Sequence, residues 1–313
     1  MRKSQKTTAN TRRGWQIWWI GLVPVIVGLL AANTIWVDSH TRPAAARGGG
    51  KIIDTGVEPA NVRVEGQGPA ILLLHGFGAA IDWWDNIAAE LAAHHRVIRV
   101  DLIGHGGTAA PAAGYAIARQ AQLAAALLDK LDVDHVTVIG HSMGGEVAVA
   151  LAENDPERID RMILIDSPPT ADTTFTIMTK VYLMPIVGEM LCHFESDEAI
   201  RRGLAQGFAP NFSIPEKFVT DLRQLTYRAF RSAHDESIAY RTARPPYQRL
   251  AAITPSPRLL AIFGSLDAIV PPEHAKLFER VPGAKVAMIK GAGHSPMVEA
   301  PTETAKLIED FLK

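Results

Sequence analysis

The sequence predicts an α/β protein in which a mostly parallel central sheet is covered by helices on both faces. Short runs of β-forming residues alternate with longer helical segments, as expected for strands joined by helical crossovers. The run Ala70–Leu74 is apolar throughout, which is typical of a strand buried on both faces of a parallel sheet. With 313 residues, 47% of them apolar, the chain can form one large domain with a substantial core.

The expected elements fall into two blocks separated by a helical stretch. Between residues 171 and 257 the alternation lapses, and we predict a helical cap inserted between the sixth and seventh strands of a core formed by 51–170 and 258–313. The alternative is that these helices are ordinary core helices of one larger domain. Strands are expected at 51–54, 61–64, 70–74, 96–100, 136–139, 162–165, 258–263 and 284–289, and helices at 83–93, 118–131, 143–153, 273–280 and 302–312.

The N-terminal region predicts a transmembrane anchor. Residues 14–37 contain no charged side chain, carry tryptophans near both ends and are long enough to span a bilayer. Five basic and no acidic residues lie in the tail 1–13, so the positive-inside rule places the tail in the cytoplasm and the remaining chain outside it. A cleaved signal peptide, with Arg12-Arg13 as a weak twin-arginine signal, is the alternative. Residues 38–50, rich in Ala and Gly, are expected to form a flexible linker.

Composition and charge narrow the possible partners. The net charge is −1 and the arginines are scattered, so no nucleic-acid partner is expected. A single cysteine, Cys192, excludes an internal disulfide and a cysteine-based metal cluster. No metal-ligand spacing and no glycine-rich phosphate loop stand out, so we expect neither a metal nor another cofactor. The oligomeric state stays open.

The stretch Val138–Gly145 holds the strongest chemical signal. A predicted strand ends there in Gly-His-Ser-Met-Gly, and helix-forming residues follow. A serine on a sharp strand-to-helix turn exposes its hydroxyl, and Gly140 and Gly144 leave room for the turn. This pattern predicts a nucleophile elbow at Ser142, with the Met143 N–H aimed at the same space.

Over residues 51–313 the sequence resembles the α/β-hydrolase family. The resemblance depends on five motifs in the family's order, each just after a predicted strand: His75–Gly78, Asp101–Thr108, the elbow, Gly264–Asp267 and Gly293–His294.

This resemblance implies a catalytic triad in which Ser142 is the nucleophile, His294 the base and Asp267 the acid. A serine hydroxyl needs such a base, and the base needs a partner that fixes its tautomer. Asp166, just after the preceding strand, is a rival for the acid, because some family members place it there.

The resemblance also suggests that the backbone N–H groups of Phe77 and Met143 form an oxyanion hole. Gly76 and Gly78 would keep the first loop close to the substrate. His75 and His141 belong to motifs that pack beside the site, and His105 is expected to brace its own loop.

A serine hydrolase of carboxylic esters is the leading functional hypothesis, with a small-molecule substrate and no cofactor. An aspartate nucleophile, as in related epoxide hydrolases and dehalogenases, is excluded by Ser142. The apolar cluster 175–184 at the start of the cap favours an acyl or aromatic substrate, unless it only packs the cap onto the core. Hydrolysis of a carbon–carbon bond, cofactor-free perhydrolysis by the same triad, and a non-catalytic binding protein on this scaffold are the alternatives.

Overall fold

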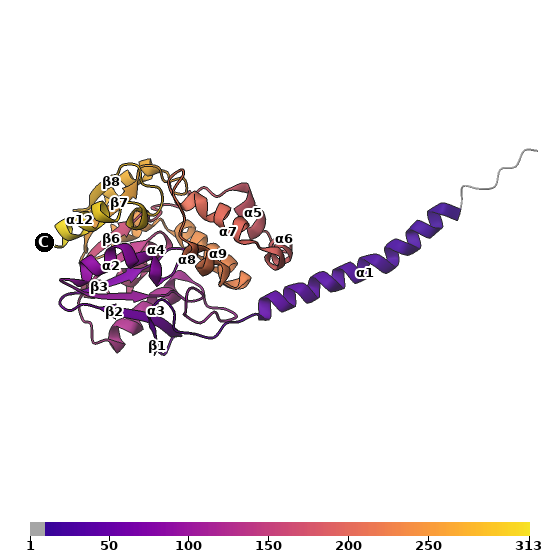
Figure 1. The fold of residues 1–313 in the computed structure, drawn as a ribbon, viewed down its shortest axis with the longest axis horizontal. Coiled ribbons are helices and arrows are strands. Elements are labelled where there is room, and N and C mark those ends of the chain that lie inside the picture. The colour runs from indigo at the N-terminus through magenta and orange to yellow at the C-terminus, as the bar shows by residue number, and fades with distance from the viewer. Residues whose placement is uncertain (1–9) are drawn as a thin grey trace, which may run out of the picture.

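A computed structural model describes residues 10–313, and their side chains from Leu22 onward. Its centre is one eight-stranded sheet with the order β1-β2-β4-β3-β5-β6-β7-β8 (Figure 1). β1 and β2 run antiparallel at one edge, and every pairing from β4 to β8 is parallel. The strands are Lys51–Asp54, Pro59–Glu65, Ala70–Leu74, Arg96–Val100, Val136–His141, Ile159–Ile165, Arg258–Gly264 and Lys285–Ile289.

Side-chain alternation along the strands divides the core between the two faces of the sheet. In β3, Leu72 and Leu74 join one buried cluster, with residues of α3 and α4. Ile71 joins the opposite cluster, with residues of α2 and α12. Both sets are buried because a strand directs successive side chains to opposite faces. These helices are α2 Asp85–Ala92, α3 Ile117–Lys130, α4 Met143–Asn154 and α12 Pro301–Leu312.

The predicted fold class is confirmed. All eight expected strands are present, and β2 and β6 begin two and three residues earlier than expected. One expected helix differs in type, because the segment Pro272–Arg280 (η5) is a 3₁₀ helix. Prolines at 271 and 272 suit the start of such a turn, because they have fixed φ angles and no N–H to donate.

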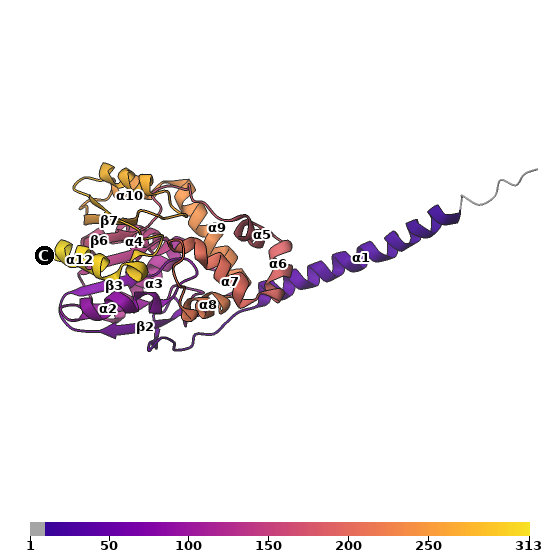
Figure 2. The same ribbon diagram turned by 45° about the horizontal axis from the view of Figure 1, so that its top comes forward.

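The segment between β6 and β7 is helical, as predicted. Its helices lie together at one end of the molecule (Figure 2). They do not form a separate hydrophobic core in the described chain, since Ala229 and Leu250 join one sheet cluster and Phe218 joins the other. The α-helices are α5 Ile177–Leu183, α6 Val187–Leu191, α7 Asp197–Leu204, α8 Glu216–Arg223, α9 Tyr227–Ala243 and α10 Pro246–Leu250, and Cys192–Phe194 forms the 3₁₀ helix η3.

A long helix, α1 (Asn10–Ser39), projects from the cap end of the molecule (Figures 1 and 2). It includes the predicted span 14–37. Its part Leu22–Ser39 has a mean hydropathy of 1.6 and is almost entirely unburied, so α1 is a candidate membrane span or signal helix.

The prediction of a flexible linker at 38–50 is not met for residues 42–45, which are hydrogen-bonded to the core. Arg42 pairs with Ala110 through backbone hydrogen bonds of 3.0 and 2.7 Å, and its guanidinium donates to the Thr108 carbonyl at 3.0 Å. The Ala45 N–H donates to the Gly107 carbonyl at 2.8 Å. The alanines and glycines of this segment predicted a flexible linker. The segment is nevertheless ordered on the core, because its hydrogen bonds are made by backbone groups and by the Arg42 side chain.

Candidate active site

Ser142 occupies the turn between β5 and α4. Its φ of 50° and ψ of −120° are unusual for a residue with a side chain, and its N–H donates to the Ile165 carbonyl at 2.9 Å. A Cβ on Gly140 would lie 2.5 Å from the Gly144 carbonyl oxygen, and one on Gly144 would lie 2.1 Å from the Leu74 carbonyl oxygen. The two glycines are therefore needed for the close packing of this turn, which gives the geometry of a nucleophile elbow.

His294 lies between Ser142 and Asp267. Its Nε2 is 2.9 Å from Ser142 Oγ, and its Nδ1 is 2.7 Å from Asp267 Oδ2. The other oxygen of Asp267 accepts the N–H groups of Ile269 and Val270 at 2.7 and 2.9 Å. Asp267 and His294 are both buried. The three side chains thus have the contacts that transfer of the serine proton to His294 requires.

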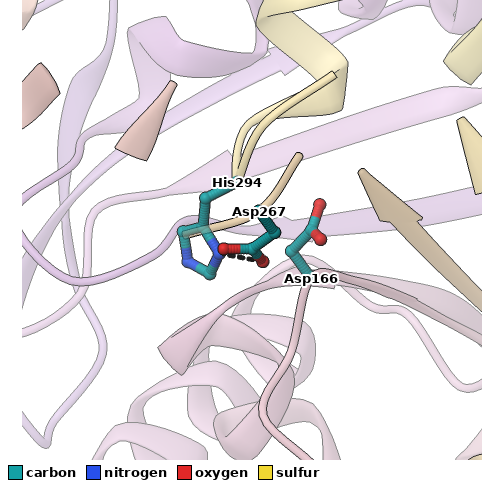
Figure 3. Close-up of side chains that lie close together, drawn as sticks. All are labelled: Asp166, Asp267 and His294. Atoms are coloured by element: carbon teal, nitrogen blue, oxygen red, sulfur yellow. Dashed lines mark hydrogen bonds and ion pairs between the residues drawn. The ribbon is translucent and has the colours of Figure 1, made fainter. Parts of the chain in front are cut away.

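Asp166, the alternative acid, lies on the far side of Asp267 from His294 (Figure 3). Its Oδ1 accepts the Gly264 N–H at 3.0 Å, and its buried Oδ2 has no partner among the described residues. Burial and the adjacent Asp267 carboxylate raise the pKa of Asp166 well above its usual range. Burial opposes ionisation of Asp267, but the charge and hydrogen bonds around its carboxylate, chiefly those of His294, together outweigh this effect and lower its pKa. The geometry therefore favours Asp267 as the partner of His294, with the Asp166 carboxyl group behind it.

Asp166, Asp267 and His294 also lie close enough to offer three ligands to one metal ion, with ligand atoms within 4.8 Å of one another. However, both nitrogens of His294 are occupied by Ser142 and Asp267. A metal bound by this cluster would have to displace one of these contacts, so the cluster fits a triad better than a metal centre.

The two residues proposed as oxyanion donors line the same small cavity as Ser142. The N–H groups of Phe77 and Met143 have no acceptor in the part of the chain that the structure describes. A Cβ on Gly76 would lie 2.7 Å from His141 Nδ1, so glycine there permits the approach of the two loops. Gly78 has a φ of 72°, which glycine tolerates best.

Three buried histidines hold the loops around the serine. His75 Nδ1 donates to the Gly76 carbonyl at 2.8 Å, and its Nε2 accepts the Leu102 N–H at 2.9 Å. His141 Nε2 donates to the His294 carbonyl at 2.7 Å, and His105 contacts the Ile103 carbonyl of its own loop at 3.2 Å. Burial lowers the pKa of His75 to about 4 and that of His105 and of His141 to about 3. All three are therefore neutral near pH 7, and their ring contacts tie the loops together.

An apolar cavity of about 140 Å³ opens over Ser142 and His294. The cap supplies much of the wall of this cavity. Of the cap residues that line it, the sequence had indicated only Phe175. Helical spacing alone does not indicate which face of a cap helix lies over the serine. The apolar side chains that line the cavity are Phe77, Trp83, Phe175, Leu204, Leu222, Phe230 and Ile269.

A smaller cavity of about 30 Å³ also reaches Ser142 and shares Phe77 and Phe175 with the first. Its wall includes Glu146 of α4 and Arg241 of α9, whose Oε1 and Nε atoms are 3.0 Å apart. Ser237 also donates to Glu146 Oε1, at 2.9 Å. Burial raises the pKa of Glu146 to about 7, although Arg241 and Ser237 act in the opposite direction. This buried pair joins the helix behind the nucleophile to the cap.

Comparison with known families identifies the fold. A model of the alpha/beta hydrolase family matches residues 71–307, which is most of the chain. The chain therefore belongs to the alpha/beta hydrolase family, as the order of its motifs predicted.

Characterised relatives differ in the bond that they cleave. A pimeloyl-[acyl-carrier protein] methyl ester esterase of Aeromonas hydrophila is 28% identical over 270 residues, covering 79% of this chain and 96% of the relative. A 2-hydroxymuconate semialdehyde hydrolase of a Pseudomonas species is 26% identical over 287 residues, covering 84% of this chain and 93% of the relative. These similarities support a hydrolase, without fixing an ester as its substrate.

Among solved structures, a bacterial membrane phospholipase A has a TM-score of 0.67 and 22% identity. The match covers 96% of this chain and 98% of that protein, so it extends into α1. At this identity the similarity shows the shared fold alone.

Proposed function

We propose that this chain is a membrane-anchored serine hydrolase that cleaves carboxylic esters of small or lipophilic substrates. The hydrogen-bonded set Ser142, His294 and Asp267 beneath an apolar cavity is the observation that supports it. The proposal treats 171–257 as the cap over the core 51–170 and 258–313.

In the proposed reaction, His294 Nε2 takes the hydroxyl proton as Ser142 Oγ attacks the ester carbonyl carbon. Asp267 keeps the other ring proton on Nδ1 and stabilises the imidazolium, while the N–H groups of Phe77 and Met143 stabilise the oxyanion. His294 then gives its proton to the departing alcohol, leaving an acyl group on Ser142. A water molecule, deprotonated by His294, releases the acid and restores the serine.

Labelling with a fluorophosphonate probe, together with turnover of a series of p-nitrophenyl esters, tests this proposal. Ser142→Ala should abolish labelling and lower kcat by roughly 10⁶-fold. The exposed Ser213 provides a matched control, and Ser213→Ala should retain both activities. An unlabelled Ser142 and no turnover in the wild type would instead support a non-catalytic binding protein.

Carbon–carbon bond hydrolysis is a second candidate, because a 2-hydroxymuconate semialdehyde hydrolase is among the relatives. The same three side chains could serve that reaction. Turnover of vinylogous diketones measured beside the ester series distinguishes the two. A preference for the diketones, with fluorophosphonate labelling intact, would replace the ester proposal by this one.

Membrane anchorage by residues 14–37 is supported by the length and hydropathy of α1. In this arrangement residues 1–13 lie in the cytoplasm and the catalytic domain lies outside it. Full-length protein should resist carbonate extraction from host membranes, and its domain should be cleaved by protease added outside the cytoplasmic membrane. A soluble mature protein that lacks α1 would indicate a cleaved signal peptide.

A further inference from the structure

Exposed apolar side chains are concentrated on one part of the cap. Eight large apolar residues between Ile177 and Phe194 are exposed, and Ile177, Phe194 and Met178 have exposed fractions of 79%, 78% and 71%. Apolar side chains exposed in such number over a short segment mark a binding surface more often than isolated exposed residues do. We name these residues the apolar cap patch: Ile177, Met178, Met184, Ile186, Val187, Met190, Leu191 and Phe194.

The part of the apolar cap patch in α6 and η3 lies beside the C-terminal part of α1. Glu189 of α6 accepts a hydrogen bond of 2.5 Å from the Thr34 hydroxyl, and His193 Nε2 is 2.7 Å from Asn33 Oδ1. Trp36 also packs on His193, with ring centroids 5.1 Å apart. Figures 1 and 2 both show α6 next to this end of α1, while the rest of the helix extends away from the domain.

The level of these contacts matches the expected surface of a bilayer. The uncharged part of α1 begins at Gly14, directly after Arg13. An α-helix rises about 30 Å from Gly14 to Asn33, and this distance equals the thickness of the hydrocarbon layer. Asn33 therefore falls at the boundary of a membrane spanned by α1. The patch residues that flank Glu189 and His193 then lie at the same boundary.

The connection between α1 and the domain fixes this arrangement. Residues 42–45 are hydrogen-bonded to the loop 104–110 of the core, and Arg228 of α9 donates to the Asp38 carbonyl at 3.0 Å. The domain is thus attached to α1 through both the core and the cap, so the same side of the cap faces the membrane whenever α1 spans it.

We propose that the apolar cap patch binds the lipid bilayer that α1 spans, with its side chains inserted among the headgroups and the upper acyl chains. This inference depends on the proposed membrane anchorage. Lipid is favoured over a second copy of the chain, because α6 of the patch contacts α1, whose own apolar side chains are exposed, such as Leu29 at 66% exposure. Apolar residues at an interface partition into lipid in this way.

Contact of the patch with lipid would also define the route of the substrate. Ile177 and Met178 belong to α5, and Thr179 of the same helix lines the cavity over Ser142. Phe175, just before α5, lines that cavity as well. A lipophilic ester dissolved in the bilayer would therefore reach the serine beside α5, without crossing bulk water.

Depth-dependent fluorescence quenching in vesicles tests the contact. The full-length chain is labelled with an environment-sensitive fluorophore at single cysteines in a Cys192→Ser background and reconstituted in phosphatidylcholine vesicles with brominated lipids. Met178→Cys and Phe194→Cys place the label in the patch, Leu29→Cys places it in α1, and Met288→Cys is an exposed apolar control at 44% exposure on the core.

We expect deep bromines to quench the label at position 29 and shallow bromines to quench the labels at 178 and 194. The label at 288 should be unaffected. Quenching at 29 without quenching at 178 and 194 would overturn the patch proposal and leave the anchor intact. Absence of quenching at 29 would overturn both. Cross-linking between copies through 178 or 194, without lipid quenching, would identify a dimer interface instead.

Activity in the same vesicles gives an independent measurement. Met178→Ser/Phe194→Ser should lower turnover of an ester carried in the bilayer severalfold and leave turnover of a soluble short-chain ester unchanged. Ile52→Ser/Met288→Ser, which removes two exposed apolar side chains from the core, should change neither rate. Equal turnover of the bilayer ester by both double variants would contradict the proposal, whatever the bond specificity of the enzyme.

Discussion

The site at the carboxyl ends of the strands and the cap that covers it differ in how they are held. Asp267 and His294, with exposed fractions of 6% and 5%, lie in the loops that follow β7 and β8, and their hydrogen bonds fix them. In the cap, Ile177 and Phe194 expose more than three quarters of their surface. We interpret this difference as a division of roles in the proposed enzyme, in which the sheet carries the reacting groups and the cap governs what reaches them. The predictions below test that division, from the largest expected effect to the smallest.

Asp267→Asn should produce the largest effect, because it removes the carboxylate that fixes the His294 tautomer. A loss of about 10⁴-fold in kcat is expected. Asp166→Asn should lose far less, since this side chain lies behind Asp267 (Figure 3) and accepts the Gly264 N–H, which an amide oxygen can still do. Steady-state kinetics of both variants separates the two carboxyl groups. If Asp166→Asn alone abolished turnover, the acid would be Asp166.

Stability should show the same contrast between the core and the cap. Trp84 is fully buried against the sheet, so Trp84→Ala should lower the free energy of unfolding by about 3–5 kcal/mol. Phe194→Ala removes an exposed ring and should change it by less than about 0.5 kcal/mol. Chemical denaturation in a mild detergent measures both. Similar losses would mean that the patch is packed in the native state.

Sequence patterns and structure agree most closely where contacts are local. The strand Ala70–Leu74 and the glycines around Ser142 carry their structural reasons within a few residues, so both could be predicted. His294 and Asp267 could be placed from short motifs after strands, while their distances needed the structure.

Contacts between distant segments left no such pattern. Leu204 lines the cavity over Ser142 only because the cap folds back over the sheet. The ion pair between Glu146 and Arg241 forms for the same reason. Arg42 is similar, because the alanine- and glycine-rich sequence around it resembles a flexible linker until the loop 104–110 supplies hydrogen-bond partners. Ile177 and Met178 are exposed, so these two residues fit neither role expected for the start of the cap, and their exposure could be read only from the folded chain.

Glu146 lies where the sheet domain and the cap meet, and it should make stability depend on pH. Its pKa is about 7 in the folded chain, against a usual value near 4.5, so between these values the folded state binds a proton that the unfolded state has lost. The contribution of this proton to the free energy of unfolding is complete below about pH 4.5 and is lost as the pH rises through 7. With about 1.4 kcal/mol per pKa unit, it amounts to roughly 3 kcal/mol.

Glu146→Gln should therefore flatten the fall in the free energy of unfolding between about pH 4.5 and pH 7. Denaturation midpoints of both proteins across this range measure the difference. Parallel curves would mean that Arg241 keeps Glu146 ionised, and the contact between α4 and α9 would then be an ordinary ion pair.

The smallest effect should come from a cap residue in the cavity wall that makes no hydrogen bond to the triad among the described contacts. Leu204 of α7 lines the cavity, and Leu204→Ala enlarges it without altering the triad. We expect the ratio of kcat/KM for hexanoyl over acetyl esters to rise roughly tenfold, in line with the modest discrimination that apolar pockets provide. Met288→Ala, exposed and distant from the cavity, is the control and should leave the ratio unchanged. A fall in kcat for every ester after Leu204→Ala would show that the cap also positions the reacting groups, and the division between chemistry and selection would then fail.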